Sequence, residues 1–147
     1  MTYDHSWSTR VSPMDIVHAT FLSFPIACFS LAVLTDLAYL QTLNLLWLHF
    51  SEWLLFAGLV FGVLAALSLL INFVVRRVRP SGLAILAGIV VLLLAAVNSF
   101  VHTADGWTAV MPYGLALSIL TVIVMVITAW LGRLRASHVH VREVHHV

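Results

Sequence analysis

The sequence predicts an all-α membrane protein, a four-transmembrane-helix up-down bundle with its N and C termini in the cytoplasm (N-in/C-in). Three observations predict this fold: the composition, four long apolar runs and the positions of the arginines. Of the 147 residues, 62% are hydrophobic and 9% are charged, whereas about a quarter of the residues in a soluble domain are charged. This composition excludes a water-soluble monomer.

Each apolar run is near the ~20 residues that a helix needs to cross the hydrocarbon core. The runs are Ile16–Leu37, Phe50–Val75, Leu83–Val101 and Tyr113–Leu131. The first run is interpreted as a helix and not as a cleaved signal peptide, because Asp4 and Asp15 precede it and no small-residue cleavage site follows it. Connections of about a dozen residues or fewer favour antiparallel neighbours.

All seven basic residues are arginines, and all lie on one side of the predicted membrane. They are Arg10, Arg76, Arg77, Arg79, Arg133, Arg135 and Arg142. The connections Ala38–His49 and His102–Pro112 contain none. The positive-inside rule therefore places these two connections outside. We expect a cytoplasmic segment at residues 1–12, a transmembrane domain at 13–132 and a His-rich cytoplasmic tail at 133–147, of which Ser137–Val147 is expected to be unstructured.

The predicted localisation is the bacterial inner (cell) membrane, as a multi-pass protein whose first partner is the lipid bilayer. Nucleic acid is excluded as a partner because the arginines cluster beside apolar runs and not along one face. Gly58 and Gly62 form a GxxxG step, and Ala84 with Gly88 gives the third helix a similar small face. Such faces permit close helix contacts, within the chain or with a membrane protein partner or homo-oligomer, although Gly and Ala are also common in membrane helices.

Polar residues from three predicted helices gather near the outer face. Asp36 lies at the outer end of the first helix, His49 and Glu52 at the start of the second, and Asn98, His102 and Asp105 at the end of the third. Ionisable groups in membrane spans need partners or a polar cavity. We therefore interpret this set as a cofactor or ligand site. The alternatives are solvated side chains near helix ends and, for Asp36 and Asn98, a structural hydrogen bond between helices.

Two histidines on neighbouring helices are the minimum for ligation of haem b, with Asp or Asn side chains orienting the rings. His49 and His102 are the candidates, and Asp36, Asn98 and Asp105 complete the predicted site. The same residues could instead hold a divalent metal or line a proton or quinone site. The familiar hydrolase, nucleotide and nicotinamide motifs are missing from the sequence, so no catalytic residue is predicted.

The cytoplasmic side offers weaker candidates. Asp15 and His18 lie at the start of the first helix, where Asp15 suits the positive end of the helix dipole. We interpret them as a helix cap. The tail histidines could bind a transition metal weakly, but we favour an unstructured end.

Several short blocks resemble a bacterial membrane family catalogued as a domain of unknown function, the DUF2231 type. The blocks are His18 with Phe24-Pro25-Ile26, Thr35-Asp36-Leu37-Ala38-Tyr39, Trp47 with Phe50-Ser51 and Trp53-Leu54-Leu55, Gly58-Leu59-Val60, Val97-Asn98-Ser99-Phe100-Val101-His102 and Asp105-Gly106-Trp107-Thr108. The resemblance implies a compact inner-membrane bundle and supplies no activity. It also implies characteristic positions at His18, Asp36, Asn98, His102, Asp105 and Trp107. Asn72 stands where relatives tend to have Asp, and His49 departs from the pattern.

The sequence thus predicts an integral inner-membrane protein with a polar cofactor or ligand site at its outer face, for which electron transfer through haem b is one hypothesis. A second hypothesis is a non-enzymatic structural or accessory subunit of a larger membrane complex. A third is a small transporter that works as an oligomer.

The arginine positions generate a topology prediction. A reporter fused after Val147 should be cytoplasmic, while one inserted near Thr42 should be external, because the flanking arginines stay inside. Enzymatic reporters active on only one side of the membrane measure this. An external C terminus would reverse the predicted orientation.

Overall fold

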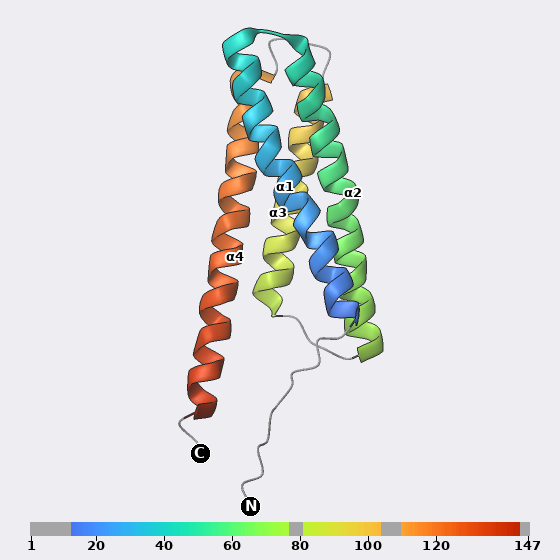
Figure 1. Ribbon diagram of the computed structural model, residues 1–147, viewed down its shortest axis with the longest axis vertical. Helices are drawn as coiled ribbons and strands as arrows, with labels where there is room; N and C mark the ends of the chain where they lie inside the picture. The colour runs from blue at the N-terminus through green and yellow to red at the C-terminus, as the bar shows by residue number, and fades with distance from the viewer. Residues whose placement is uncertain (1–12, 77–80, 104–109, 145–147) are drawn as a thin grey trace, which may run out of the picture.

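The computed structural model of the chain describes residues 13–76, 81–103 and 110–144. It contains the helices α1 (Pro13–Thr42), α2 (Leu45–Arg76), α3 (Gly82–Thr103) and α4 (Leu115–Val144), with the short π-helical turn η1 (Val110–Gly114) before α4 (Figure 1). The described residues include no strand. Four helices of the described residues are long and apolar enough to cross a membrane, which confirms the predicted all-α membrane class with four spans.

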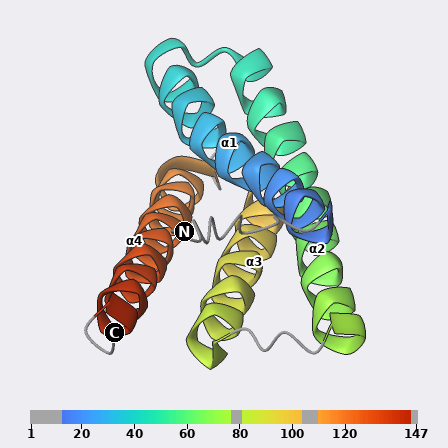
Figure 2. The ribbon, with the colours of Figure 1, turned by 60° about the horizontal axis from the view of Figure 1, so that its bottom comes forward.

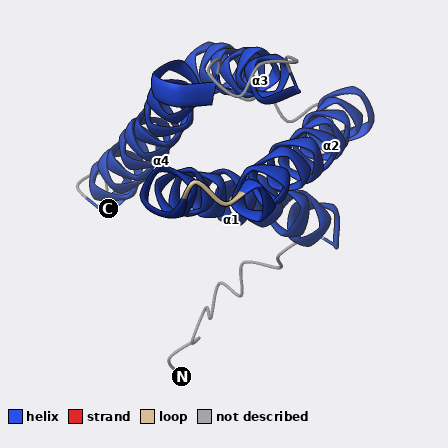
Figure 3. Cartoon of the chain, turned by 90° about the horizontal axis from the view of Figure 1, so that it is seen from above, coloured by secondary structure: helices blue, strands red, loops and turns tan. Residues whose placement is uncertain are grey.

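The helices are arranged as a ring in chain order. α1 packs against α2 and α4, and α3 packs against the same two helices (Figure 3). The view from below shows the same order around the axis (Figure 2). α1 begins and α4 ends at the lower end of the bundle in Figure 1. The up-down arrangement therefore agrees with the prediction from the short connections.

The first connection is shorter than the sequence predicts. We expected a connection over Ala38–His49, but α1 continues to Thr42 and α2 begins at Leu45. The physical reason is a small apolar contact, because Tyr39 and Leu48 are buried against each other. This contact keeps one more turn of each helix in place although the local sequence is partly polar.

The last helix also extends beyond the predicted domain boundary. The apolar span ends at Trp130, close to the predicted Leu131, but α4 continues to Val144. The expectation of an unstructured tail is therefore wrong for residues 137–144, and residues 145–147 lie outside the described part. The sequence after Gly132 contains no Gly or Pro, so nothing in it breaks the helical backbone.

The described helices are apolar outside and partly polar inside. Large apolar side chains cover the outer surface; Phe100 is 76% exposed and Val75 is 74% exposed. The buried polar residues are Asp36, Ser51, Ser68, Asn72, Asn98, His102, Ser118 and Thr121. An apolar exterior of this extent requires a lipid environment. Polar side chains inside the bundle find their partners on neighbouring helices.

The buried residues of α1 and α2, many of them small or polar, form one continuous seam between the two helices. Its buried positions alternate at spacings of three and four residues, which places them on one face of each helix. On α1 they are Pro25, Phe29, Ala32, Asp36 and Tyr39, and on α2 they are Leu48, Ser51, Leu55, Gly58, Gly62, Ala65, Ser68 and Asn72. The centre of the seam is an apolar core of Phe29, Ala32, Leu55 and, from α3, Ala95.

The two glycines of the GxxxG step make defined contacts. A Cβ atom at Gly58 would collide with the ring of Phe29, and one at Gly62 would lie 2.6 Å from Cδ2 of Leu92. A Cβ atom at Gly88 would meet nothing within 4 Å. The predicted close approach is therefore present at Gly58 and Gly62, whereas Gly88 on the small face of α3 packs against no described residue.

This difference predicts the effect of substitution. Gly58→Leu should lower the free energy of unfolding by about 1–3 kcal/mol, because the new side chain must displace the ring of Phe29. Gly88→Leu is the matched control and should change stability little. Thermal unfolding of both variants in detergent, followed by circular dichroism, measures the effect. Equal effects at the two sites would show that the close contact at Gly58 does not stabilise the bundle and that this glycine is present only because glycine is common in membrane helices.

Candidate functional site

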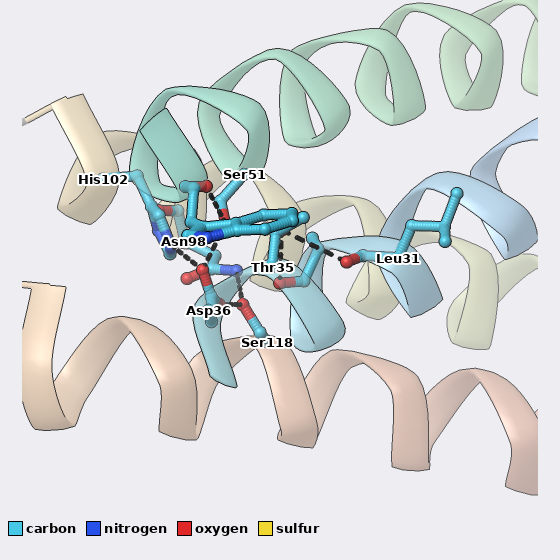
Figure 4. Close-up of polar contacts among 9 residues, drawn as sticks. Leu31, Thr35, Asp36, Ser51, Asn98, His102 and Ser118 are labelled. Atoms are coloured by element: carbon cyan, nitrogen blue, oxygen red, sulfur yellow. Dashed lines mark hydrogen bonds and ion pairs between the residues drawn. The ribbon is translucent and has the colours of Figure 1, made fainter. Parts of the chain in front are cut away.

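A single carboxylate, that of Asp36, joins all four helices near one end of the bundle (Figure 4). Asp36 is fully buried and lies six residues before the end of α1. Its Oδ1 atom accepts a hydrogen bond of 2.5 Å from Ser51 on α2 and lies 2.9 Å from Nε2 of His102 on α3. Its Oδ2 atom accepts a hydrogen bond of 2.6 Å from Ser118 on α4. Each of the other three helices therefore directs one polar group at this carboxylate.

The packing of α1 on α2 determines the partner of Asp36 on α2. Asp36 follows Phe29 by seven residues, and Ser51 precedes Gly58 by seven residues. Seven residues are close to two helical turns. In antiparallel helices, the contact of Phe29 with Gly58 therefore places Asp36 opposite Ser51. The hydroxyl of Thr35 also lies 2.7 Å from that of Ser51.

His102 is oriented by its own helix. Its Nδ1 atom lies 2.9 Å from the backbone carbonyl oxygen of Asn98, one turn earlier on α3. A carbonyl oxygen can only accept a hydrogen bond, so Nδ1 is protonated and its N–H group donates the hydrogen bond. This bond turns Nε2 toward Asp36, and the side chains of His102 and Asp36 are both 0% exposed.

The contact between Asp36 and His102 contains one proton. If the proton is on Nε2, an imidazolium faces a carboxylate; if it is on Oδ1, a neutral acid donates to a neutral ring. The pair has no net charge in either arrangement. A neutral pair is the state that a fully buried site in a membrane favours, since an unpaired charge there is costly.

Asn98 extends the network toward α4. Its Nδ2 atom donates a hydrogen bond of 2.8 Å to the hydroxyl of Ser118, which in turn donates to Asp36. Its Oδ1 atom is buried and has no hydrogen-bond partner among the residues that the structure describes. The three side chains thus form a chain of hydrogen bonds that runs from amide to hydroxyl to carboxylate.

Three of the five predicted site residues lie in this network: Asp36, Asn98 and His102. His49 does not join it. The side chain of His49 is 63% exposed, and its Nδ1 atom lies 3.3 Å from Oε2 of Glu52 on the same helix. Asp105, the fifth predicted residue, lies outside the described residues.

This geometry does not fit the hypothesis of haem b between His49 and His102. Axial ligation needs a free ring nitrogen, but both ring nitrogens of His102 are hydrogen-bonded inside the bundle. His49 is exposed and pairs with Glu52. In the described part of the chain, no three His, Cys, Asp or Glu side chains are grouped to hold a metal ion. His102 serves here as the partner of Asp36.

Sequence reasoning missed Ser51 and Ser118. A hydroxyl in a membrane helix commonly bonds a carbonyl of its own helix, as Thr121 does with Leu117, so Ser118 offers no distinguishing signal. For Ser51 a signal existed, because it lies two turns from Gly58 on the small-residue face of α2. That spacing places Ser51 in the contact between α1 and α2 to which Gly58 belongs.

A second polar contact lies at the opposite end of the seam. Nδ1 of His18 lies 2.9 Å from the hydroxyl of Ser68 and 3.1 Å from the carbonyl oxygen of Ala65. The hydroxyl of Ser68 also donates to that carbonyl at 2.7 Å. His18 therefore connects α1 to α2, a contact that its interpretation as part of a helix cap did not predict.

The fold and the lipid-facing surface define a multi-pass integral membrane protein. The chain belongs to the DUF2231 family, described as a predicted membrane protein, whose sequence profile matches residues 15–145. This match confirms the resemblance found from the short sequence blocks. No curated protein and no solved structure gives a significant match.

The shared carboxylate predicts strong coupling between Asp36 and His102. Asp36→Leu and His102→Leu should each lower the free energy of unfolding by about 3–5 kcal/mol, because each leaves a buried polar partner unpaired. The double variant should cost less than the sum of the two. Unfolding in mixed micelles measures all three.

His49→Leu is the matched control for this cycle, since the ring of His49 is exposed and we expect little change in stability. Additive effects of the two buried substitutions would contradict direct coupling between the side chains of Asp36 and His102.

Proposed function

We propose that this protein is a non-enzymatic proton-binding protein of the bacterial inner membrane, which exchanges protons with the outer aqueous phase at the Asp36–His102 pair. One observation carries the proposal: an acid and a base face each other at 2.9 Å, fully buried within membrane-spanning helices. Ionisable residues inside membrane spans are costly, and they commonly mark proton relays or ligand sites.

The charge of the pair depends on how many protons it holds. With one proton the pair is neutral; without it a carboxylate faces the lone pair of Nε2, and with a second proton the pair carries a positive charge. A change of charge acts strongly in the low-dielectric interior. Because Asp36 also bonds Ser51 and Ser118, we infer that proton exchange alters contacts among all four helices.

The depth of the pair supports exchange with water at one side. Asp36 lies six residues from the end of α1, which is roughly 9 Å along a helix. The positive-inside rule assigns this end of the bundle to the outer face. Glu52, next to Ser51 in the chain, and the exposed His49 provide titratable groups at the same end. We propose that protons reach the pair through these groups and transient water.

A second candidate function is that of a structural or accessory subunit for a membrane partner. It is favoured by the observation that Asp36 accepts a hydrogen bond from both Ser51 and Ser118, so that the carboxylate also acts as a static link between helices. In this case the pair would keep its single proton at every physiological pH. The two functions therefore differ in a measurable property, the protonation of the pair.

Infrared spectroscopy of the full-length protein in lipid nanodiscs tests the proposal. Between about pH 5 and pH 8, the range in which histidine normally titrates, we expect coupled changes in the carboxyl band of Asp36 and the imidazole bands of His102. Carbon-13 labelling separates the aspartate and histidine bands from the others, and comparison with the variants assigns them to Asp36 and His102, since the chain also contains other aspartates and histidines. Asp36→Asn and His102→Gln should each remove both changes.

Ser68→Ala, at the opposite end of the seam, is the control and should leave both changes in place. If the bands of Asp36 and His102 do not change with pH, the proton-binding proposal is contradicted and the structural function is favoured. Visible absorption of a b-type haem in the same sample, lost on substitution of either His49 or His102, would instead restore the electron-transfer hypothesis.

A further inference from the structure

Asn98 carries an unpaired polar atom next to the Asp36–His102 pair. Its side chain is fully buried, its Nδ2 atom donates to Ser118 at 2.8 Å, and its Oδ1 atom has no donor among the described residues. Unpaired buried carbonyl oxygens are uncommon. A change in the protonation of the neighbouring Asp36–His102 pair can give this oxygen a hydrogen-bond donor.

When the first proton is on Nε2 of His102, a second proton on the pair has one available position. Oδ1 of Asp36 already faces two donors, the hydroxyl of Ser51 and Nε2 of His102. A further proton on Oδ1 would force both to withdraw. Oδ2 faces one hydroxyl, that of Ser118, and a hydroxyl can rotate from donor to acceptor. The added proton therefore belongs on Oδ2.

Protonation of Oδ2 reverses the chain of hydrogen bonds. The new O–H group of Asp36 donates to the Ser118 hydroxyl, so the hydroxyl proton of Ser118 must point toward Asn98. In this structure it would meet the NH₂ group of Asn98, which is also a donor. The conflict disappears when the amide turns over and presents Oδ1 to Ser118.

We propose that the side-chain amide of Asn98 turns over when the Asp36–His102 pair binds a second proton, which makes Asn98 and Ser118 the relay that transmits protonation from α1 to α3 and α4. The inference rests on the proposed function. From the imidazolium–carboxylate arrangement, one proton enters from the outer water and forms one O–H bond on Asp36, and every other covalent bond is retained; from the acid–imidazole arrangement, the proton on Oδ1 also passes to Nε2 of His102. Two hydrogen bonds run in one direction before the change and in the opposite direction after it.

Other ionisable groups at this end must be separated from the signal. Those in the described residues are His102 on α3, His49 and Glu52 on α2, Tyr39 on α1 and Tyr113 on η1; Asp105 lies outside these residues. The amide of Asn98 does not titrate itself, so its carbonyl vibration responds to protonation through its hydrogen bond.

The chain contains three asparagines, Asn44, Asn72 and Asn98. Full-length protein carrying Asn44→Ser and Asn72→Ser, with carbon-13 in the asparagine side-chain carbonyl, reports on Asn98 alone. On acidification in nanodiscs, we expect the Asn98 carbonyl band to shift to lower frequency as its oxygen gains a hydrogen bond. The shift should have the same pH midpoint as the appearance of the Asp36 acid band.

Substitutions of Ser118 test the relay directly. Ser118→Ala should abolish the Asn98 shift while Asp36 still protonates, and Ser118→Thr, which keeps the hydroxyl, should retain it. An Asp36 acid band that appears without an Asn98 shift would overturn the relay and leave the proton-binding proposal standing. An Asn98 shift that survives in Ser118→Ala would also overturn the relay. If Asp36 never gains or loses a proton, the proposed function itself fails.

Discussion

The carboxylate of Asp36 is the group on which the arrangement of the four helices depends. In lipid, apolar side chains gain little by leaving the surrounding acyl chains, so helix association relies on close packing and hydrogen bonds. The fully apolar part of the core is correspondingly small, with Phe29 and Leu55 as its largest buried side chains. Directional contacts must then specify which helix faces which, and Asp36 supplies one to each of the other three helices.

The polar and apolar contacts of α1 and α2 belong to one register. The lack of a side chain at Gly58 admits the ring of Phe29, and two turns away the same register brings Asp36 to Ser51. Toward the other end of the seam it brings His18 to Ser68. A change at Gly58 would therefore act on Asp36 through helix position, without contact between the two residues. α3 and α4 complete the carboxylate site that the α1–α2 pair begins.

The hydrogen bonds around Asp36 connect the stability of the helix bundle to the protonation of the Asp36–His102 pair. With a single proton in the contact to His102, the carboxylate oxygens and the Ser118 hydroxyl have partners, and the unpaired atom of the network is Oδ1 of Asn98. In the proposed relay, that atom becomes the end of the reversed chain of hydrogen bonds once the amide of Asn98 has turned over. The same side chains hold the helices together in the neutral state of the pair, so the structural and the proposed proton-binding functions share these contacts and differ in whether the protonation of the pair changes.

The sequence by itself determined the membrane-spanning class, the number of spans and the gathering of Asp36, Asn98 and His102 near one end, because hydropathy and span length depend only on local composition. It ended the first helix too early and began the second too late, since the contact between Tyr39 and Leu48 joins residues that hydropathy averages into a polar connection. Tertiary structure alone decided which histidine meets Asp36. Hydropathy and position in the span do not separate His49 from His102, because the direction of a side chain around a helix depends on how that helix packs. Packing turns His102 inward and leaves His49 exposed. It also brings the hydroxyls of Ser51 and Ser118 to Asp36, although each hydroxyl could equally have bonded a carbonyl of its own helix.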